Sequence, residues 1–388
     1  MHSKPILVFG GGNSETLLIA ERQVRIGGKN EVRIASTFGG SGVNCAVRLL
    51  SMNAPAMPLL SIGDDSIGHE IQAFMEEVAT AADTGGIALA YLRSPRFFTP
   101  GMRTAQSTVL VDAGTRTIFK SKHSDETGFY SSLASRIADM DGQLDAEPAA
   151  ISIGHLPFPR GEADGKSDPT AAIVERFHGR CPIFINFGQE QLSKGYSHWA
   201  SLLEKADYVQ MHINEARRFF EASIPSTKLP DLAEFLSGLQ PAFCITLDHF
   251  GAICFQGRKS HDSVFIFVPE YINDESMVVD PTGAGDAFIA GTMFHFWRAG
   301  LLAASGDRIW DVSALSAALD EGRKWAAFAC TKLGGASNPP DAARLRQFVN
   351  QRQFDTAQPL TLYDRTASEQ FLRIIDKAFQ QSELHSQQ

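Results

Sequence analysis

The stretch Asp280–Gly291 (DPTGAGDAFIAG) holds the residues of this sequence that are best suited to chemistry. Gly283, Ala284 and Gly285 let a ligand approach the backbone closely, and the apolar run after them predicts a buried helix. A glycine-rich turn before a helix presents free N–H groups and the positive end of the helix dipole, which suits a phosphate. Asp286 at that place is a candidate general base. The alternative is that Asp286 only caps its helix and the glycines only form a turn.

A second glycine-rich stretch, Phe38–Asn44 (FGGSGVN), leads into another helical pattern. Asn44 stands at the expected start of that helix, where it is either a cap or a hydrogen-bonding group for a ligand. The sequence leaves both readings open.

Near the N-terminus, a short apolar strand is followed by three glycines and then by Asn13 and Glu15. A dinucleotide fingerprint that starts at Gly10 would need glycine or alanine where Glu15 stands, so the GxGxxG pattern fails. We expect instead a loop in which the amide of Asn13 and the carboxylate of Glu15 face a polar ligand.

Strands that alternate with helices must position these residues. We expect strands at 5–9, 56–62, 149–153, 182–186, 208–212 and 243–247, and a hairpin at 252–256 and 264–268. We expect helices at 45–52, 69–81, 169–178, 198–204, 214–221, 229–239 and 312–331. This alternation predicts a mostly parallel sheet with helices on both faces.

Two β-rich stretches interrupt the alternation. A turn at Gly27 and Gly28 separates alternating segments within 23–35, and further strands are expected at 87–92, 107–111 and 117–119. We expect them to form one small subdomain, a lid made from about 21–36 and 86–122, within a domain that spans 1–345. Residues 161–169 predict a surface loop, and the more polar residues 346–388 predict a helical, polar C-terminal extension.

Composition excludes several classes of protein. The chain has 388 residues, 44% of them apolar, a net charge of −9 and both signs scattered, which argues against a nucleic-acid or anionic-membrane surface. No apolar run is long enough for a transmembrane helix, and the N-terminus does not resemble a signal peptide. Five widely separated cysteines argue against a zinc site and a disulfide framework and predict the reducing cytoplasm.

The two glycine-rich stretches resemble the signatures of the PfkB family of carbohydrate kinases. Asp280–Phe288 is close to D-[ST]-x-G-A-G-D-x-F, with Pro281 and Thr282 in altered order, and Gly39–Ala46 resembles the first signature, which Gly63 closes. The resemblance runs from about residue 5 to 340. It implies a ribokinase-like fold, with three α/β/α layers, a mostly parallel sheet and a small β-sheet lid.

The resemblance also implies roles for the residues at these signatures. Asp286 matches the base that takes a proton from the acceptor hydroxyl, and Gly283, Ala284 and Gly285 match the anion hole for the transferred phosphoryl group. Gly39, Gly40 and Asn44 match positions that contact the sugar. Glu15 falls where many members place an aspartate that binds sugar hydroxyls, and Asn13 lies beside it.

A second set of residues resembles the family's metal and nucleotide sites. Glu215 matches the glutamate of an N-x-x-E motif that orders the Mg²⁺ shell through water, although His212 replaces the asparagine. Thr246–Gly251 resembles a T-L-G-x-x-G nucleotide loop, with Asp248 in place of the first glycine. Gly335 and Asn338 lie where the family closes its adenine pocket. Many members hold a monovalent cation such as K⁺ near the position of Asp280.

These matches predict an ATP- and Mg²⁺-dependent kinase that phosphorylates a hydroxyl of a sugar or sugar-like molecule. One alternative is a nucleoside kinase of the same fold, with Phe97 and Phe98 as an aromatic slot for the base. Another is a catalytically silent PfkB-like binding or regulatory module, because Glu15, His212 and Asp248 depart from the family pattern. We expect no nucleic-acid or membrane partner, and we expect homodimerisation through the exposed strand edges of the lid.

Overall fold

The structure of the chain is a computed structural model. It describes residues 4–20, 22–83, 86–112, 115–120, 132–133, 136–137, 147–156, 169–221, 223, 232, 235–236, 238–255, 264–271, 277–302, 310–351, 358–361, 373 and 377–378. The predicted loop at 161–169, except for Pro169, and most of the predicted helix at 229–239 lie outside these residues.

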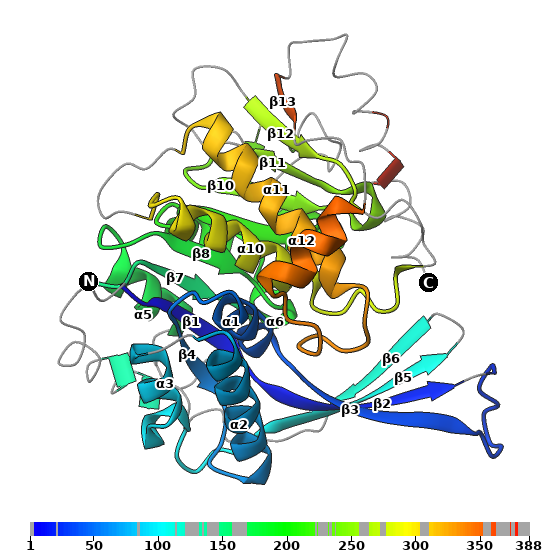
Figure 1. Cartoon of the computed structure of the whole chain (residues 1–388). Helices are drawn as coiled ribbons and strands as arrows, with labels where there is room; N and C mark the ends of the chain where they lie inside the picture. Colours follow the sequence, from blue (N-terminus) through cyan, green and yellow to red (C-terminus); the bar gives the residue numbers. More distant parts are fainter. Residues whose placement is uncertain are drawn as a thin grey trace.

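A nine-stranded sheet forms the centre of the molecule (Figure 1). Its strands, in spatial order, are β13 (Gln358–Thr361), β12 (Val264–Val268), β11 (Ala252–Phe255), β10 (Ala242–Thr246), β9 (Tyr208–His212), β8 (Ile183–Asn186), β7 (Ala150–Ile153), β1 (Ile6–Gly11) and β4 (Ala56–Ser61). The strands from β10 to β4 are parallel, whereas β11, β12 and β13 pair antiparallel at one end.

The parallel strands are apolar on both faces. Every residue of β4, β7 and β8 is buried, as is β1 up to its last residue. A parallel sheet covered by helices on both faces needs such strands, because neither face meets water. The predicted alternation is thereby confirmed, with strand boundaries that differ by at most two residues.

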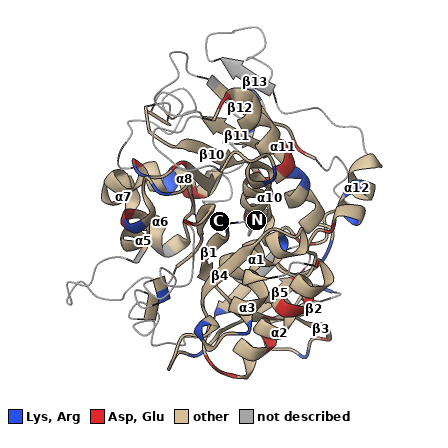
Figure 2. Ribbon diagram, turned by 60° about the vertical axis from the view of Figure 1, so that its left-hand side comes forward, with Lys and Arg blue, Asp and Glu red and all other residues tan. Residues whose placement is uncertain are grey.

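Helices cover the two faces of this sheet (Figure 2). One layer contains α5 (Pro169–Phe177), α6 (Gln189–Leu192), α7 (Gly195–Leu203) and α8 (Ile213–Phe220). The other contains α1 (Ser41–Ser51), α2 (Ser66–Ala81), α3 (Ile87–Leu92), α10 (Ala284–Arg298), α11 (Val312–Ala329) and α12 (Ala342–Asn350). Two short 3-10 helices are η1 (Pro95–Phe97) and η3 (Asp248–Phe250). Among the helices of the described ranges, none has both the length and the apolar character of a membrane span.

A second, four-stranded sheet projects from the body of the molecule (Figure 1). Its order is β3 (Val32–Gly39), β2 (Asn13–Ala20), β5 (Ala105–Asp112) and β6 (Thr115–Lys120). The chain passes from β1 through Gly12 into β2 and returns from β3 through Gly40 into α1. The base of this second sheet therefore lies at the carboxyl end of β1.

Two predictions about the second sheet need correction. Its strands span 13–39 and 105–120 rather than 21–36 and 86–122, because Asn13–Glu15, expected as a loop, pairs with both β3 and β5. The predicted strand at 87–92 is wrong, since Ile87–Leu92 forms helix α3. Its buried residues, Ala88, Tyr91 and Leu92, have helical spacing, which a short apolar run does not distinguish from a strand.

The predicted C-terminal extension, 346–388, is only partly helical where the structure describes it. Helix α12 covers its start, but β13 joins the large sheet beside β12. The edge of β12 offers unpaired N–H and C=O groups, and a strand satisfies them better than a helix.

Candidate active site

Asp286 lies in the first turn of α10, and its carboxylate faces other elements of the fold. Its Oδ2 accepts a hydrogen bond from Asn44 Nδ2 at 2.8 Å, and its Oδ1 accepts one from Asn186 Nδ2 at 3.2 Å. The cap position of α10 belongs to Gly283, which has a left-handed φ of 74°. Asp286 therefore does not cap its helix, and both of its oxygens are oriented by amide groups.

The backbone around Asp286 presents free donors at the N-terminus of α10. Ala284 N–H donates to the carbonyl of Pro281 at 3.1 Å, within the turn. The N–H groups of Gly283, Gly285 and Asp286 have no acceptor among the described residues. Three unsatisfied N–H groups beside a helix dipole form a site for an anion. Of the predicted set of Gly283, Ala284 and Gly285, the Ala284 amide is therefore already used, and among the described residues the amide of Asp286 is free in its place.

Asn44 does not cap α1, so that reading of the sequence is wrong. The helix begins at Ser41 after Gly40, and Asn44 N–H donates to the carbonyl of Gly40 within the first turn. The Asn44 side chain is buried and donates to Asp286, while its Oδ1 has no hydrogen-bond partner in the described part of the chain. Asn44 thus has a buried acceptor available beside the carboxylate of Asp286.

Three glycine-containing segments converge at this point. A Cβ on Gly283 would lie 2.9 Å from the carbonyl oxygen of Gly335, and a Cβ on Gly335 would lie 2.8 Å from Asn44 Nδ2. Larger residues would push these segments apart. Gly335, expected in the adenine pocket, therefore packs against the Asn44–Asp286 pair.

A polar cluster lies at the base of the second sheet. Asn13 Nδ2 donates to Ser107 Oγ at 3.0 Å and to Glu15 Oε1 at 3.3 Å. Glu15 is 9% exposed, and its carboxylate lies over Gly39, where a Cβ would come within 2.8 Å of Glu15 Cδ. The Oδ1 of Asn13 is buried and has no partner among the described residues. The predicted pair Asn13 and Glu15 is brought together here with Gly39.

Gly40 is required by the backbone itself. Its φ is 93°, and a Cβ would lie 2.5 Å from the carbonyl oxygen of Gly11. Packing between β1 and the start of α1 therefore demands glycine at this position whether or not a sugar contacts it.

His212 and Asp248, the two residues that depart from the nucleotide and metal motifs of the PfkB family, lie next to each other. His212 ends β9, Asp248 begins η3, and His212 Nε2 lies 2.9 Å from Asp248 Oδ1. Asp248 has a left-handed φ of 52°, a conformation that favours glycine. Burial alone would lower the pKa of His212, but the hydrogen bond and charge of Asp248 outweigh it and raise that pKa above its usual 6.5. The extra carboxylate is thus paired with the imidazole of His212.

Glu215 is positioned by the start of α8. Its Oε2 accepts a hydrogen bond from His212 N–H at 2.8 Å, in a capping box. Among the described residues, no group of three or more His, Cys, Asp or Glu side chains could hold a metal ion. A single carboxylate such as that of Glu215 fits an ion such as Mg²⁺, which commonly uses one or two carboxylates together with waters and substrate phosphates.

The remaining predicted nucleotide residues lie in the loop after β10. Thr246 Oγ1 donates to the carbonyl of Met211 at 3.5 Å. Gly251 has a φ of 100°, and a Cβ there would clash with the carbonyl oxygen of Val268 at 2.0 Å. The loop conformation is therefore fixed by packing against β9 and β12.

Asn338 and Asp280 use their side chains inside the protein. Asn338 donates to the carbonyl of Phe328 at 2.7 Å and accepts from Arg344 at 2.6 Å, and only 1% of it is exposed. Asp280 accepts from Thr282 N–H and Oγ1 at 2.9 and 2.6 Å and from Gly334 N–H at 2.8 Å. Both residues hold loops in place, and direct contact of Asn338 with a nucleotide does not fit its burial.

Sequence reasoning missed Asn186, Gln210 and Ser107. Asn186 ends β8 and contacts Asp286, while Gln210 Nε2 donates to the carbonyl of Gly285 at 2.8 Å. A usable signal existed for Asn186, because polar residues at the carboxyl ends of parallel strands face the ligand crevice in such sheets. Ser107 carried no such signal, since it lies in a strand of the second sheet.

Phe97 and Phe98 do not form an aromatic slot. They are 0% and 7% exposed and pack against each other in the core, so the nucleoside alternative loses this support.

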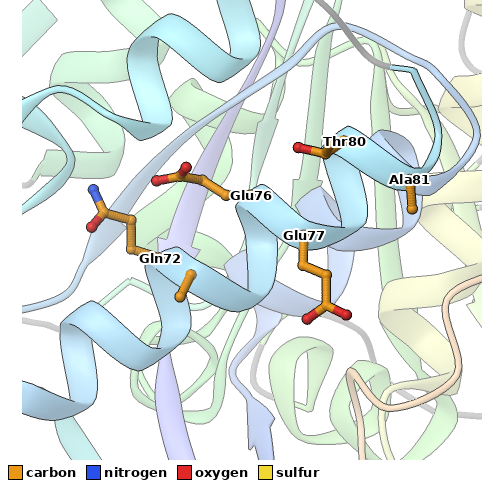
Figure 3. Close-up of a pocket in the computed structure, with 6 residues that line it drawn as sticks. Gln72, Glu76, Glu77, Thr80 and Ala81 are labelled. Atoms are coloured by element: carbon orange, nitrogen blue, oxygen red, sulfur yellow. The ribbon is translucent and has the colours of Figure 1, made fainter.

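A separate hollow lies on the outer face of α2, where Gln72, Glu76 and Glu77 project from the helix (Figure 3). Its acidic lining does not suit a phosphate ligand, and it contains none of the residues described above.

Comparisons with known proteins agree with this architecture. Residues 173–342 match the family model described as pfkB family carbohydrate kinase. No curated protein sequence matches the chain. The structure is similar to ribokinase from Giardia lamblia, at 17% identity and a TM-score of 0.63, over 90% of this chain and 99% of that one.

Two further solved structures have the same fold. Nucleoside kinase from Burkholderia thailandensis, in complex with inosine, is similar at 16% identity and a TM-score of 0.60, over 90% of this chain and 98% of that one. Ribokinase from Cryptococcus neoformans, in complex with ADP, is similar at 16% identity and a TM-score of 0.58, over 90% of this chain and 100% of that one. The predicted resemblance to the PfkB family of carbohydrate kinases is therefore confirmed over residues 173–342, and the chain as a whole has the ribokinase-like fold.

Proposed function

We propose that this protein is an ATP-dependent kinase that transfers the γ-phosphate to a hydroxyl of a sugar or sugar-like molecule. The observation that carries the proposal is the environment of Asp286. Its carboxylate is oriented by Asn44 and Asn186, and it lies in the same helical turn as three N–H groups without acceptors among the described residues. A base and an anion site next to each other are what phosphoryl transfer to a hydroxyl requires.

Each group has a defined task in this reaction. Asp286 accepts the proton of the acceptor hydroxyl, because each carboxylate oxygen keeps a lone pair beyond the one that an asparagine occupies. The N–H groups of Gly283, Gly285 and Asp286 stabilise the charge on the phosphoryl group as it moves. Mg²⁺, when bound with the nucleotide, neutralises phosphate charge, and Glu215 is the residue that would hold it through water.

The acceptor is proposed to lie between α1 and the base of the second sheet. Asn13 Oδ1 and Asn44 Oδ1 are buried acceptors without donors in the described structure. A buried acceptor of this kind is costly until a donor reaches it. A molecule rich in hydroxyl groups supplies such donors, which favours a polyol over an apolar ligand.

The nucleotide is proposed to lie along the loop Thr246–Gly251, with Gly335 at the junction with Asp286. A K⁺ ion held by backbone oxygens near Asp280 belongs to the same proposal. We further propose a homodimer formed through the second sheet and, from the cysteine pattern of the sequence, a location in the cytoplasm.

The first test is an acceptor panel. Purified protein with Mg²⁺ and ATP is incubated with ribose, fructose, 2-keto-3-deoxygluconate, adenosine and inosine, and ADP and phosphorylated product are measured, with K⁺ present or replaced. We expect a sugar to be phosphorylated. Turnover of adenosine or inosine alone would support the nucleoside kinase instead. ATP binding without transfer to any acceptor would favour the silent module.

The second test is Asp286→Asn, which keeps the shape of the side chain and removes the base. We expect kcat to fall by about 10²- to 10⁴-fold while the protein still folds and melts cooperatively. Asp64→Asn is the matched control, because the Asp64 side chain is 63% exposed. Near wild-type turnover of Asp286→Asn would remove Asp286 as the base.

A further inference from the structure

A buried arginine lies behind the site and has no part in the mechanism above. Arg48 belongs to α1 and is 1% exposed. One terminal nitrogen donates to the carbonyl of Asn44 at 2.7 Å, and the other donates to the carbonyl of Gly335 at 2.6 Å. The Nε of Arg48 has no hydrogen-bond acceptor in the described part of the chain.

The charge of Arg48 is not matched by an ion pair. Both of its acceptors are neutral carbonyls, and no ion pair joins it to an Asp or Glu among the described residues. Burial lowers the pKa of Arg48, and the charge of Asp286 opposes that change. A guanidinium nevertheless stays protonated in proteins, and a buried cation without a paired anion is destabilising. Its neighbours on α1, including Val47 and Leu49, show that this position could have been apolar.

Both contacts of Arg48 lead to the N-terminus of α10. Asn44 donates to Asp286, and the carbonyl of Gly335 lies 2.9 Å from where a Cβ of Gly283 would be. The guanidinium therefore ties together the two segments that support the base and the anion site. Its positive charge also interacts with the carboxylate of Asp286, inside a low-dielectric core where charges act strongly.

We propose that Arg48 is a positioning residue that fixes Asn44 and Gly335 around Asp286, and that its buried positive charge strengthens the attraction of this site for the phosphates of the bound nucleotide. The role in transfer rests on the proposed kinase function. The binding of a polyphosphate does not, so it can be measured separately.

The test compares Arg48→Met, which keeps the length and loses the charge, with Arg48→Lys, which keeps the charge. Binding of inorganic tripolyphosphate, of ATP and of ADP with aluminium fluoride is measured by calorimetry, and kcat and KM for ATP are measured with the acceptor found in the panel. We expect Arg48→Met to weaken tripolyphosphate and ATP by about 10- to 100-fold, with a larger loss for ADP with aluminium fluoride. We expect Arg48→Lys to lose less affinity for tripolyphosphate than Arg48→Met, because an ammonium group still supplies charge although it lacks the fork of donors that reaches both carbonyls.

Arg136→Met is the matched control, because Arg136 is also buried and donates to the carbonyls of Leu60 and Phe97, on the opposite end of the sheet from β10. We expect it to lower the melting temperature without changing affinity for tripolyphosphate. A folded Arg48→Met that binds tripolyphosphate within twofold of wild type would overturn the proposal. Equal losses of affinity for tripolyphosphate in Arg48→Met and Arg48→Lys would also overturn it.

If Arg48→Met does not melt cooperatively, Arg48→Gln takes its place in the same comparison. The two proposals fail separately. Wild-type protein that binds ATP but phosphorylates no acceptor contradicts the kinase, and the tripolyphosphate measurements still decide the part played by Arg48.

Discussion

The arrangement around Asp286 depends on two asparagines that come from distant parts of the chain. Asn44 belongs to α1 and Asn186 to the end of β8, and each donates to a different oxygen of the carboxylate. Two such bonds fix the plane of the carboxylate. Orientation of this kind contributes to catalysis because a small displacement of a reacting group is costly to the rate.

The change Asn186→Ala tests this orientation. We expect kcat to fall by about 10- to 100-fold, because Asp286 loses the donor to Oδ1 while the anion site stays intact. KM for ATP should change little. Steady-state kinetics and a thermal melt of the same preparation make the measurement.

Asn338→Ala is the contrasting variant. Asn338 is buried and donates to Phe328, so its loss should reduce the free energy of unfolding by about 1–3 kcal/mol and affect kcat less than Asn186→Ala does. An Asn186 variant that loses only stability would show that the contact with Asp286 has no role in turnover.

At the scale of helices and strands, the residue that caps α2 also holds the base of the second sheet. Asp65 precedes α2, and its Oδ1 accepts from Gly68 N–H at 2.8 Å and from Thr104 Oγ1 at 2.7 Å. Its Oδ2 accepts from Thr104 N–H at 2.8 Å. Because β5 begins directly after Thr104, one carboxylate both caps a helix and fixes the entry to the second sheet.

Asp65→Ala should reduce the free energy of unfolding by about 1–3 kcal/mol at neutral pH, since it removes a cap and the partners of Thr104. Asp64→Ala is the control, because the exposed ion pair of Asp64 with His69 contributes little. Urea denaturation of both variants gives the comparison. Equal stability of the two variants would contradict the role of Asp65.

The same carboxylate gives the expected pH dependence. Burial alone would raise the pKa of Asp65, but the hydrogen bonds from Thr104 and Gly68 outweigh it and hold that pKa below its usual 3.8. The contribution of Asp65 is therefore complete above pH 3.8 and is lost as the pH falls through the lower folded pKa. The difference in the free energy of unfolding between wild type and Asp65→Ala should become smaller in that acidic range.

Elements also show why local departures from a motif can be compatible with a fold. His212 and Asp248 each differ from the family pattern in the sequence, where they are 36 residues apart. Parallel pairing of β9 with β10 places His212 opposite Thr246, and so brings Asp248 within hydrogen-bond distance. The two departures from the family pattern are therefore joined by one hydrogen bond between His212 and Asp248.

At the scale of the whole molecule, the second sheet has two unlike faces. Strand register puts Glu15, Leu17 and Val109 on one face, and Leu17 and Val109 are buried. Ile34 and Phe119 lie on the other face and are 66% and 56% exposed. An exposed apolar face on a sheet with two open edges supports the proposed homodimer.

Sedimentation of the double variant Ile34→Glu/Phe119→Glu tests this proposal. We expect the wild type to sediment as a dimer and the variant as a monomer, because two charges replace apolar contacts at the interface. Ile26→Glu is the control, since Ile26 is fully exposed in the turn before β3 and outside the sheet. A monomeric wild type would contradict the dimer.

Much of the fold and the chemical core of the site follows from local patterns in the sequence. The buried strands and the glycine-rich turn before α10 are encoded by neighbouring residues, because apolar periodicity and small residues act over a few positions. Asp286, Asn44 and the pair Asn13 and Glu15 could be named as candidate site residues for the same reason, and their roles stay predictions.

Only the tertiary structure decided which of these residues meet and which are used elsewhere. In the folded chain, the Asn44 side chain binds Asp286 and does not cap a helix. Asn186 contacts Asp286 and Arg48 contacts Gly335. The side chain of Asn338 forms its hydrogen bonds inside the protein. Contacts between residues 100 or more positions apart depend on strand order and register. No local pattern specifies these, because they result from packing the whole sheet at once.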